Sequence, residues 1–242
     1  MAPDAIRSDA MDLARPDVTD DGAERDRVLA PFHVSRETSQ RLSRFIPLLL
    51  DRQRTTNLIA SSTIPVIWTR HVADSLQLLS LAPDARRWAD LGSGGGFPGM
   101  VIACALAETP GAHVHLIESI GKKAAFLRDA VRETAVPATV HHGRIEDVAP
   151  RLAGETDIVT ARAVAPLKEL LTMINPFLQR GAQALVMKGQ DVDAELTQAA
   201  KYWTIDHTAV PSQTSPTGRI LIVRRLERRR GHQGASGSGR TR

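Results

Sequence analysis

Residues 90–99 read Asp90-Leu91-Gly92-Ser93-Gly94-Gly95-Gly96-Phe97-Pro98-Gly99. They follow the apolar segment that starts at Trp88 and precede another that runs to Ala107. Glycine lets a backbone adopt positive φ and approach a ligand closely, and the start of a helix offers free N–H groups. The stretch therefore predicts a strand, a ligand-binding loop and a helix, in that order.

Two cofactor classes fit this loop. The pattern Gly94-x-Gly96-x-x-Gly99 matches the dinucleotide fingerprint, and Glu118 lies about where an acid would hold ribose hydroxyls. The spacing Asp90-x-Gly92-x-Gly94 resembles instead the pattern of methyltransferases, whose loop cradles the methionine end of S-adenosylmethionine. We favour this second interpretation, with Gly92, Gly94 and Glu118 as cofactor-binding residues, and keep NAD as the alternative.

Hydrophobic spacing outside the loop divides the chain into a helical part and an alternating part. Helical periodicity predicts helices over residues 38–51 and about 65–81. From residue 87 onward short strands alternate with helices, and the last two strands face each other across the turn at 211–218. The expected later helices are 121–134 and 166–178, and the expected strands are 88–91, 113–117, 138–142, 157–160, 182–187, 203–210 and 219–224. This layout predicts an α/β fold of class I methyltransferase type: Rossmann-like, with a mostly parallel sheet, a C-terminal antiparallel hairpin and preceding N-terminal helices.

Charge is uneven along the chain, whose formal net charge is +4. Residues 1–30 hold eight acidic and four basic residues, and residues 227–242 hold five arginines and one glutamate. Neither segment has hydrophobic periodicity, so we expect a disordered acidic extension over 1–30 and a disordered basic tail over 227–242. A single domain then covers 31–226, with a helical part over 31–85 and a Rossmann-like part over 86–226.

Composition excludes several classes of protein. Aromatic residues make up only 4% of the chain, which argues against an aromatic stacking platform for single-stranded RNA. No apolar run approaches the ~20 residues of a membrane span, and no secretory signal is evident, so we expect a cytoplasmic protein without membrane contact. The single cysteine, Cys104, leaves no internal disulfide or cysteine-based zinc site. His113, His115, His141 and His142 lie in strands without further ligands, and we assign no metal.

Five blocks in this order resemble one family, the small-subunit ribosomal RNA methyltransferase G family, also called glucose-inhibited division protein B. They are Asn57-Leu58-Ile59, Arg70-His71-x-x-Asp74-Ser75-Leu76, the glycine loop, Arg162-Ala163-Val164-Ala165-Pro166-Leu167 and Lys188-Gly189. The resemblance covers about residues 40–225. Where relatives carry Asp-Val-Gly or a similar triplet, this chain has Asp90-Leu91-Gly92, which is a mild departure.

The resemblance implies methyl transfer from S-adenosylmethionine to N7 of a guanine in 16S ribosomal RNA, as naked RNA or within the small ribosomal subunit. Residue by residue, it also places the cofactor against Gly92, Phe97, Ile145-Glu146 and Arg162. A monomer is expected. The sequence leaves open which residues contact the guanine.

The residue types are consistent with attack by a nitrogen that already carries a lone pair. The position after the fourth strand holds Thr160-Ala161-Arg162, where amino-methyltransferases commonly carry an Asn/Asp-Pro-Pro-aromatic motif. Cys104 lies in the first helix of the alternating part, so attack through a cysteine is disfavoured. We assign Arg162, Lys188 and His71 as catalytic residues: the two cations would bond guanine O6 or a phosphate, and His71 would help to position the RNA.

Two other functions compete with this interpretation. An NAD-dependent oxidoreductase would require further parallel βαβ units and a catalytic His, Tyr or Lys constellation, and neither is evident. A non-enzymatic RNA-binding factor with a methyltransferase-like fold would keep the basic surface without cofactor binding, and the intact glycine loop disfavours it.

Overall fold

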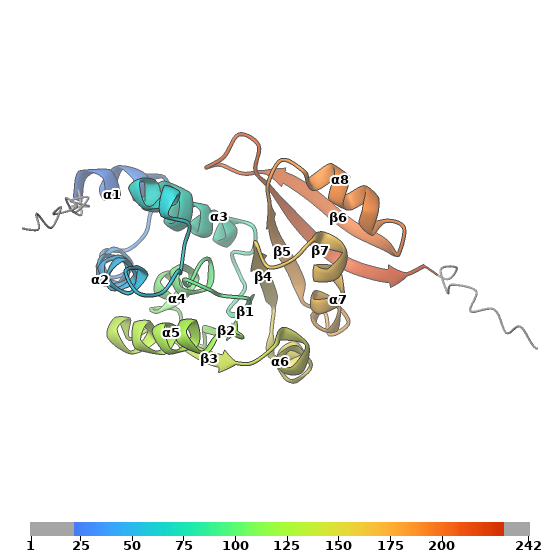
Figure 1. Cartoon of the computed structure of the whole chain (residues 1–242), viewed down its shortest axis with the longest axis horizontal. Helices are drawn as coiled ribbons and strands as arrows, with labels where there is room; N and C mark the ends of the chain where they lie inside the picture. Colours follow the sequence, from blue (N-terminus) through green and yellow to red (C-terminus); the bar gives the residue numbers. More distant parts are fainter. Residues whose placement is uncertain (1–21, 230–242) are drawn as a thin grey trace, which may run out of the picture.

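The computed structural model describes residues 22–229, and these form a sheet between two layers of helices (Figure 1). Helices that precede residue 135 cover one face, and helices that follow residue 144 cover the other. The predictions of disorder for residues 1–21 and 230–242 concern segments outside the described residues.

Seven strands form the sheet in the order β3-β2-β1-β4-β5-β7-β6. The first five are parallel, and β7 runs antiparallel to both β5 and β6. Leu91 is in register with Ile117 and Ala161, so the carboxyl ends of three neighbouring strands lie at one edge. The strands are β1 Arg87–Leu91, β2 His113–Glu118, β3 Ala138–His142, β4 Ile158–Arg162, β5 Gln183–Lys188, β6 Trp203–Pro211 and β7 Arg219–Arg228. The predicted fold class is confirmed.

The first helical layer packs on the face of the sheet that carries Trp88 and Leu116. Phe45 of α2 and Phe126 of α5 are fully buried there, with ring centroids 6.3 Å apart. Ser35 caps α2 by accepting a hydrogen bond from the Thr38 backbone N–H. The elements of this layer are α1 Gly22–Leu29, η1 Ala30–Phe32, α2 Arg36–Gln53, η2 Ser61–Val66, η3 Trp68–Ala73, α3 Asp74–Ser80, α4 Gly99–Leu106 and α5 Gly121–Thr134.

The second layer packs on the opposite face, where strand residues alternate in the usual period of two. Ala89, Leu91 and Ile117 point to this side and contact the apolar faces of the helices. The elements are α6 Ile145–Leu152, η4 Ala153–Glu155, α7 Leu167–Leu178 and α8 Val192–Ala199.

The boundaries differ from the predicted ones in three places. Residues 22–29 form a helix where we expected disorder, because buried Leu29 anchors it to the core. Strand β7 continues to Arg228, so the last ordered strand takes in residues assigned to the tail. The segment expected as one helix over 65–81 is a 3₁₀ turn, a π-helix and an α-helix in succession, and the π-helix contains Arg70 and His71.

Candidate functional site

The glycine loop lies at the carboxyl edge of the sheet, between β1 and α4. Gly92 and Gly94 both have positive φ, +66° and +54°, which is a conformation that glycine adopts without strain. A Cβ at Gly92 would lie 2.9 Å from Cγ2 of Val164, in the segment after β4. The loop is thus packed against the end of β4 on one side.

Asp90 fixes the base of this loop. Its buried carboxylate accepts hydrogen bonds from the Gly99 backbone N–H, at 3.1 Å, and from Thr160 Oγ1, at 2.9 Å. Burial raises the pKa of Asp90 to about 6, although these hydrogen bonds and the charge of Arg162 oppose the rise. The carboxylate therefore joins both ends of the loop to the neighbouring strand and acts as a structural clamp.

Glu118 ends β2 beside the loop, as the sequence predicted. Its Oε2 accepts from the Gly94 backbone N–H at 2.9 Å, and its Oε1 accepts from the Ile120 backbone N–H at 2.7 Å. Each carboxylate oxygen keeps a further lone pair. The side chain is thus held in one orientation and can still accept from ligand hydroxyls.

Three further residues near the carboxyl edge of the sheet follow β2 or β3. Ile120 is 51% exposed, although it is a large apolar residue. Ile145 is half-buried at the start of α6. Glu146 is exposed and lines a separate groove between α6 and α7, with Met173. Sequence reasoning missed Ile120, and its apolar character directly after the acid-bearing strand was the available signal.

Arg162 ends β4 and joins the glycine loop to the π-helix. Its Nη2 donates to His71 Nδ1 at 2.7 Å, its Nη1 donates to the carbonyl oxygen of Arg70 at 3.3 Å, and its Nη1 lies 3.6 Å from Asp74 Oδ2. The guanidinium carbon lies 5.4 Å from the ring centroid of Phe97, a cation–π contact. Arg162 is therefore held in one place as a fixed cation.

His71 is buried and neutral in this arrangement. Because an arginine only donates, Nδ1 of His71 must be the acceptor, and Nε2 then carries the proton and donates to Thr63 Oγ1 at 2.7 Å. Burial, reinforced by the positive charges of Arg162 and Arg70, lowers its pKa to about 3. His71 contacts Arg162 and the Phe97 ring, so the predicted part of His71 in positioning the RNA would act through these two residues.

Lys188 ends β5, and its ammonium group is already paired. Nζ lies 2.7 Å from Glu195 Oε2 and donates to the carbonyl oxygen of Ala165 at 3.1 Å. The same Glu195 oxygen accepts from the Leu167 backbone N–H. Lys188 thus ties the segment after β4 to α8, a contact that we did not predict because α8 itself was not predicted.

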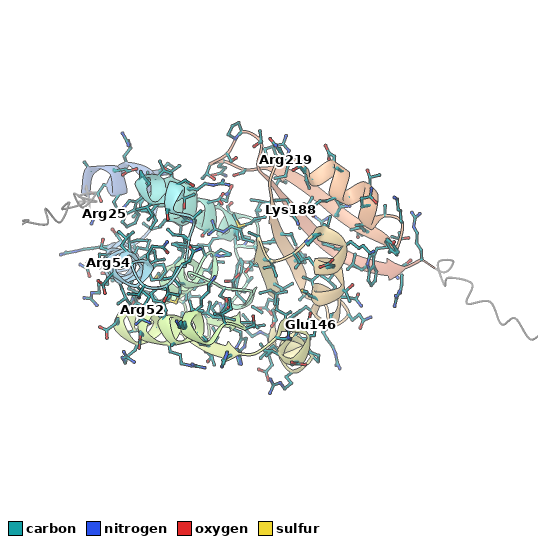
Figure 2. The ribbon with its side chains drawn as sticks, in the orientation of Figure 1. Arg25, Arg52, Arg54, Glu146, Lys188 and Arg219 are labelled. Carbon is teal, nitrogen blue, oxygen red and sulfur yellow. The ribbon has the colours of Figure 1, made fainter. Side chains whose placement is uncertain are left out.

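A cavity of about 310 Å³ opens beside Arg162. Arg70, Asp74 and Lys188 line it, and so does Arg219, which directly follows the β6–β7 turn. Figure 2 shows Lys188 and Arg219 near each other in the middle of the molecule, whereas Arg52 and Arg54 lie on the first helical layer. The cavity and the glycine loop therefore meet at the end of β4.

Other titratable groups lie away from this site. Cys104 is buried in α4, and burial raises the pKa of its thiol to about 12. His115 Nδ1 and His141 Nε2 lie 3.1 Å apart on β2 and β3, and residues 22–229 contain no group of three or more side chains arranged to hold a metal ion. Nor does any helix in that range have the length and apolarity needed to cross a membrane.

Comparison with known proteins connects this geometry to one family. The family described as rRNA small subunit methyltransferase G matches residues 38–221. A protein named ribosomal RNA small subunit methyltransferase G from Bradyrhizobium sp. strain BTAi1 is 56% identical over 206 residues, 85% of this chain and 93% of the relative. Another of that name, from Rhodopseudomonas palustris strain BisB5, is 52% identical over 224 residues, 93% of this chain and 94% of the relative.

Solved structures with lower identity share the fold. An O-methyltransferase from Bacillus cereus, solved in complex with SAH, superimposes with a TM-score of 0.56 at 16% identity, covering 83% of this chain and 96% of the other. A structure described as a putative O-methyltransferase from Klebsiella pneumoniae superimposes with a TM-score of 0.54 at 13% identity, and it covers 83% of this chain and 96% of the other. These likenesses show the α/β methyltransferase fold.

Proposed function

Because the chain belongs to the rRNA small subunit methyltransferase G family, we propose that it transfers a methyl group from S-adenosylmethionine to N7 of a guanine in 16S ribosomal RNA. Membership makes the chain a ribosomal RNA methyltransferase; the cofactor, the target atom and the roles of individual residues are the proposal. The substrate is the 16S RNA, free or within the small ribosomal subunit.

The residues at the loop fit S-adenosylmethionine. The open space beside Gly94 and the carboxylate of Glu118 suit a ligand with ribose hydroxyls, and Ile120 and Ile145 offer apolar surface to an adenine ring. The backbone of Ile145-Glu146 would supply a polar contact for the adenine amino group, because the Glu146 side chain lines the separate groove between α6 and α7. Gly92, Phe97 and Arg162 lie where the methionine end, which carries a carboxylate, meets a fixed cation. When bound, the cofactor supplies an electrophilic methyl group on a sulfonium.

The observation that carries the N7 assignment is that the acids and the histidine around the cavity are all engaged. Asp74 Oδ1 accepts from Thr214 Oγ1 and Gln77 Nε2, Glu195 pairs with Lys188, and His71 Nδ1 accepts from Arg162. Proton removal from an amine or a hydroxyl needs a free base. Guanine N7 has a free lone pair at neutral pH, so its methylation needs only alignment of nucleophile and methyl group.

The chain's own residues would then position the guanine and would not need to remove a proton from it. Arg162 stays charged between the loop and the cavity, because His71 and Asp74 hold it there. A cation at this position favours guanine, because guanine O6 accepts a hydrogen bond from it. It disfavours adenine, because the N6 amino group of adenine is a hydrogen-bond donor. Lys188 acts through the segment after β4, which it holds against α8.

The proposal is tested with small ribosomal subunits from a strain that lacks the gene, incubated with labelled S-adenosylmethionine. Mass mapping of RNA fragments should find one added methyl group on one guanine. Methylation at N7 leaves the imidazole ring positively charged, so borohydride reduction followed by aniline should cleave the chain at that nucleotide. A methylated but uncleaved guanine would refute the N7 assignment.

Cellular location and assembly belong to the same proposal. We expect the protein to work in the cytoplasm, where bacterial ribosomal RNA is found, and to act as a monomer. Sedimentation of the purified protein at micromolar concentration should give the mass of a single chain, and a dimer mass would contradict this.

A further inference from the structure

The cavity beside Arg162 has an excess of positive charge. Four cationic side chains line it, Arg70, Arg162, Lys188 and Arg219, together with two acidic side chains, Asp74 and Glu195. The acids are paired inside the protein, Asp74 with Arg162 and Glu195 with Lys188. Two positive charges therefore remain uncompensated at the cavity.

Arg70 and Arg219 carry this excess charge. Within residues 22–229, neither has a carboxylate within ion-pair distance. The Arg70 side chain is exposed, and Arg219 Nη1 donates only to the carbonyl oxygens of Gly218, at 2.9 Å, and Pro216, at 3.4 Å. Arg70 also lies close enough to Arg162 for the two cations to repel each other. Such an arrangement favours an anionic partner in the cavity.

The outer wall of the cavity is held in place by α3. In the β6–β7 turn, Thr214 Oγ1 donates to Asp74 Oδ1 at 2.6 Å, and the Gln213 backbone N–H donates to Gln77 Oε1 at 2.9 Å. Gln77 Nε2 in turn donates to Asp74 Oδ1 at 2.7 Å. Figure 1 shows this turn extending from the sheet toward the first helical layer. Asp74 and Gln77, here called the α3 clamp, thereby fix the position of Arg219, which directly follows the turn.

We propose that this cavity receives the target nucleotide after it has turned out of the RNA strand, and that Arg70 and Arg219 bind the backbone phosphates that flank it. This inference rests on the proposed function. A cavity of about 310 Å³ lies at the lower end of the ~300–1,000 Å³ of small-molecule sites, a size that suits a single nucleotide. Enzymes that modify a base commonly take it out of the stack, and contacts to the flanking phosphates would hold the strand in that conformation.

The arginines of the cavity differ in burial, and therefore in the part of the RNA that each would contact. Arg162 is fixed at the inner end beside the glycine loop, so it faces the base. Arg70 is exposed and Arg219 is half-exposed, and both line the cavity, so they can meet the phosphates of a strand that enters and leaves it. The α3 clamp keeps the opening at a fixed width.

The test compares Arg70→Ala and Arg219→Ala with Arg224→Ala. Arg224 lies on the same strand as Arg219, is exposed, and bonds Thr208 away from the cavity, so its replacement removes an equal charge. We expect each cavity variant to raise the KM for 16S RNA about tenfold and to flatten the plot of log affinity against log salt by about 0.7, the contribution of one phosphate on a single strand. Affinity for S-adenosylmethionine should not change in any of the three.

Two further variants sharpen the assignment. Arg70→Lys keeps the charge and should restore most of the salt slope, because a lysine binds a phosphate as a point charge. Gln77→Leu removes half of the α3 clamp and should raise the KM for RNA while the affinity for S-adenosylmethionine remains that of the parent protein.

Specific outcomes would overturn the inference. These are cavity variants that match Arg224→Ala in KM and salt slope, or an Arg70→Lys variant as impaired as Arg70→Ala, which would indicate recognition of a base edge. Failure of the proposed function has a different signature, since the parent protein would then bind no S-adenosylmethionine or methylate no guanine.

Discussion

Gly94 is the residue whose replacement tests the cofactor site most directly. It has φ of +54°, and a Cβ added there would have only the Gly92 carbonyl oxygen within 4 Å, at 3.7 Å. In Gly94→Ala we expect the affinity for S-adenosylmethionine to fall about tenfold or more, because the new methyl group occupies the ligand's space. Isothermal calorimetry measures this directly.

The control for that variant is Gly111→Ala. Gly111 also has positive φ, +77°, with no atom within 4 Å of the added Cβ, and it lies in the turn before β2. Both variants should therefore lose about 1–2 kcal/mol of stability from backbone strain. Equal cofactor affinity in the two would remove Gly94 from the site.

His71 determines the expected pH dependence of the rate. Its pKa is lowered to about 3, chiefly by burial, and its Nδ1 is occupied by Arg162. Single-turnover methylation should therefore be nearly flat from about pH 6 to 8.5, the range in which an ordinary histidine base would titrate. An inflection near ~6.5 that disappears in His71→Asn would make His71 a general base and would exclude the proposed mechanism.

The same pKa shift affects stability in acid. Between pH 7 and 5 the unfolded chain gains a proton on His71 that the folded protein does not bind, so the free energy of unfolding falls as pH falls, by about 2 kcal/mol. Asp90 acts in the opposite direction, because its raised pKa lets the folded state gain a proton first. Urea unfolding at pH 7 and at pH 5 should show that the free energy of unfolding falls more on acidification in the parent protein than in His71→Asn.

At the residue scale, the sequence could predict that two residues lie close together where adjacent parallel strands bring them there. Gly94 lies in the loop after β1 and Glu118 ends the adjacent parallel strand β2, so sheet topology brings them together, and the Gly94 backbone N–H donates to Glu118. Arg70 and Arg219 were missed because their meeting depends on the β6–β7 turn reaching α3, a contact across more than 130 residues. Nothing in the local pattern of either segment indicates it.

At the scale of elements, the Lys188–Glu195 pair joins β5 to α8 and holds the segment after β4. Both side chains are largely buried, so loss of one partner leaves the other unpaired. We expect a double-mutant cycle with Lys188→Ala and Glu195→Ala to give a coupling energy of about 1–3 kcal/mol in urea unfolding. A coupling below about 0.5 kcal/mol would show that the pair is a surface contact.

The elements that the sequence predicted well are those with a clear period. Strands β2 and β4 carry apolar, β-branched residues, and α5 ends at its predicted residue, Thr134. The π-helix was not predictable from local spacing, and its residue His71 contacts Arg162 and Phe97, which lie elsewhere in the chain. α8 was missed because its eight residues bury only Val192 and Ala199.

For the whole molecule, the basic tail should add affinity for RNA. Strand β7 extends to Arg228, and the Arg229 backbone N–H bonds the Tyr202 carbonyl oxygen, so a truncation should begin at residue 230. Deleting residues 230–242 removes three arginines. We expect weaker RNA binding and a salt slope reduced by up to about 2, with unchanged thermal stability. An unchanged slope would assign the tail to solubility alone.

The sheet order also has a consequence for how the protein folds during its synthesis. β7 is the last strand to be synthesised, yet it lies between β5 and β6, and the turn that walls the cavity directly precedes it. A chain that is still being synthesised has its glycine loop and the five parallel strands before β7 can insert between β5 and β6. We therefore expect a partly made chain to bind cofactor while it still lacks the wall that the cavity needs to bind RNA.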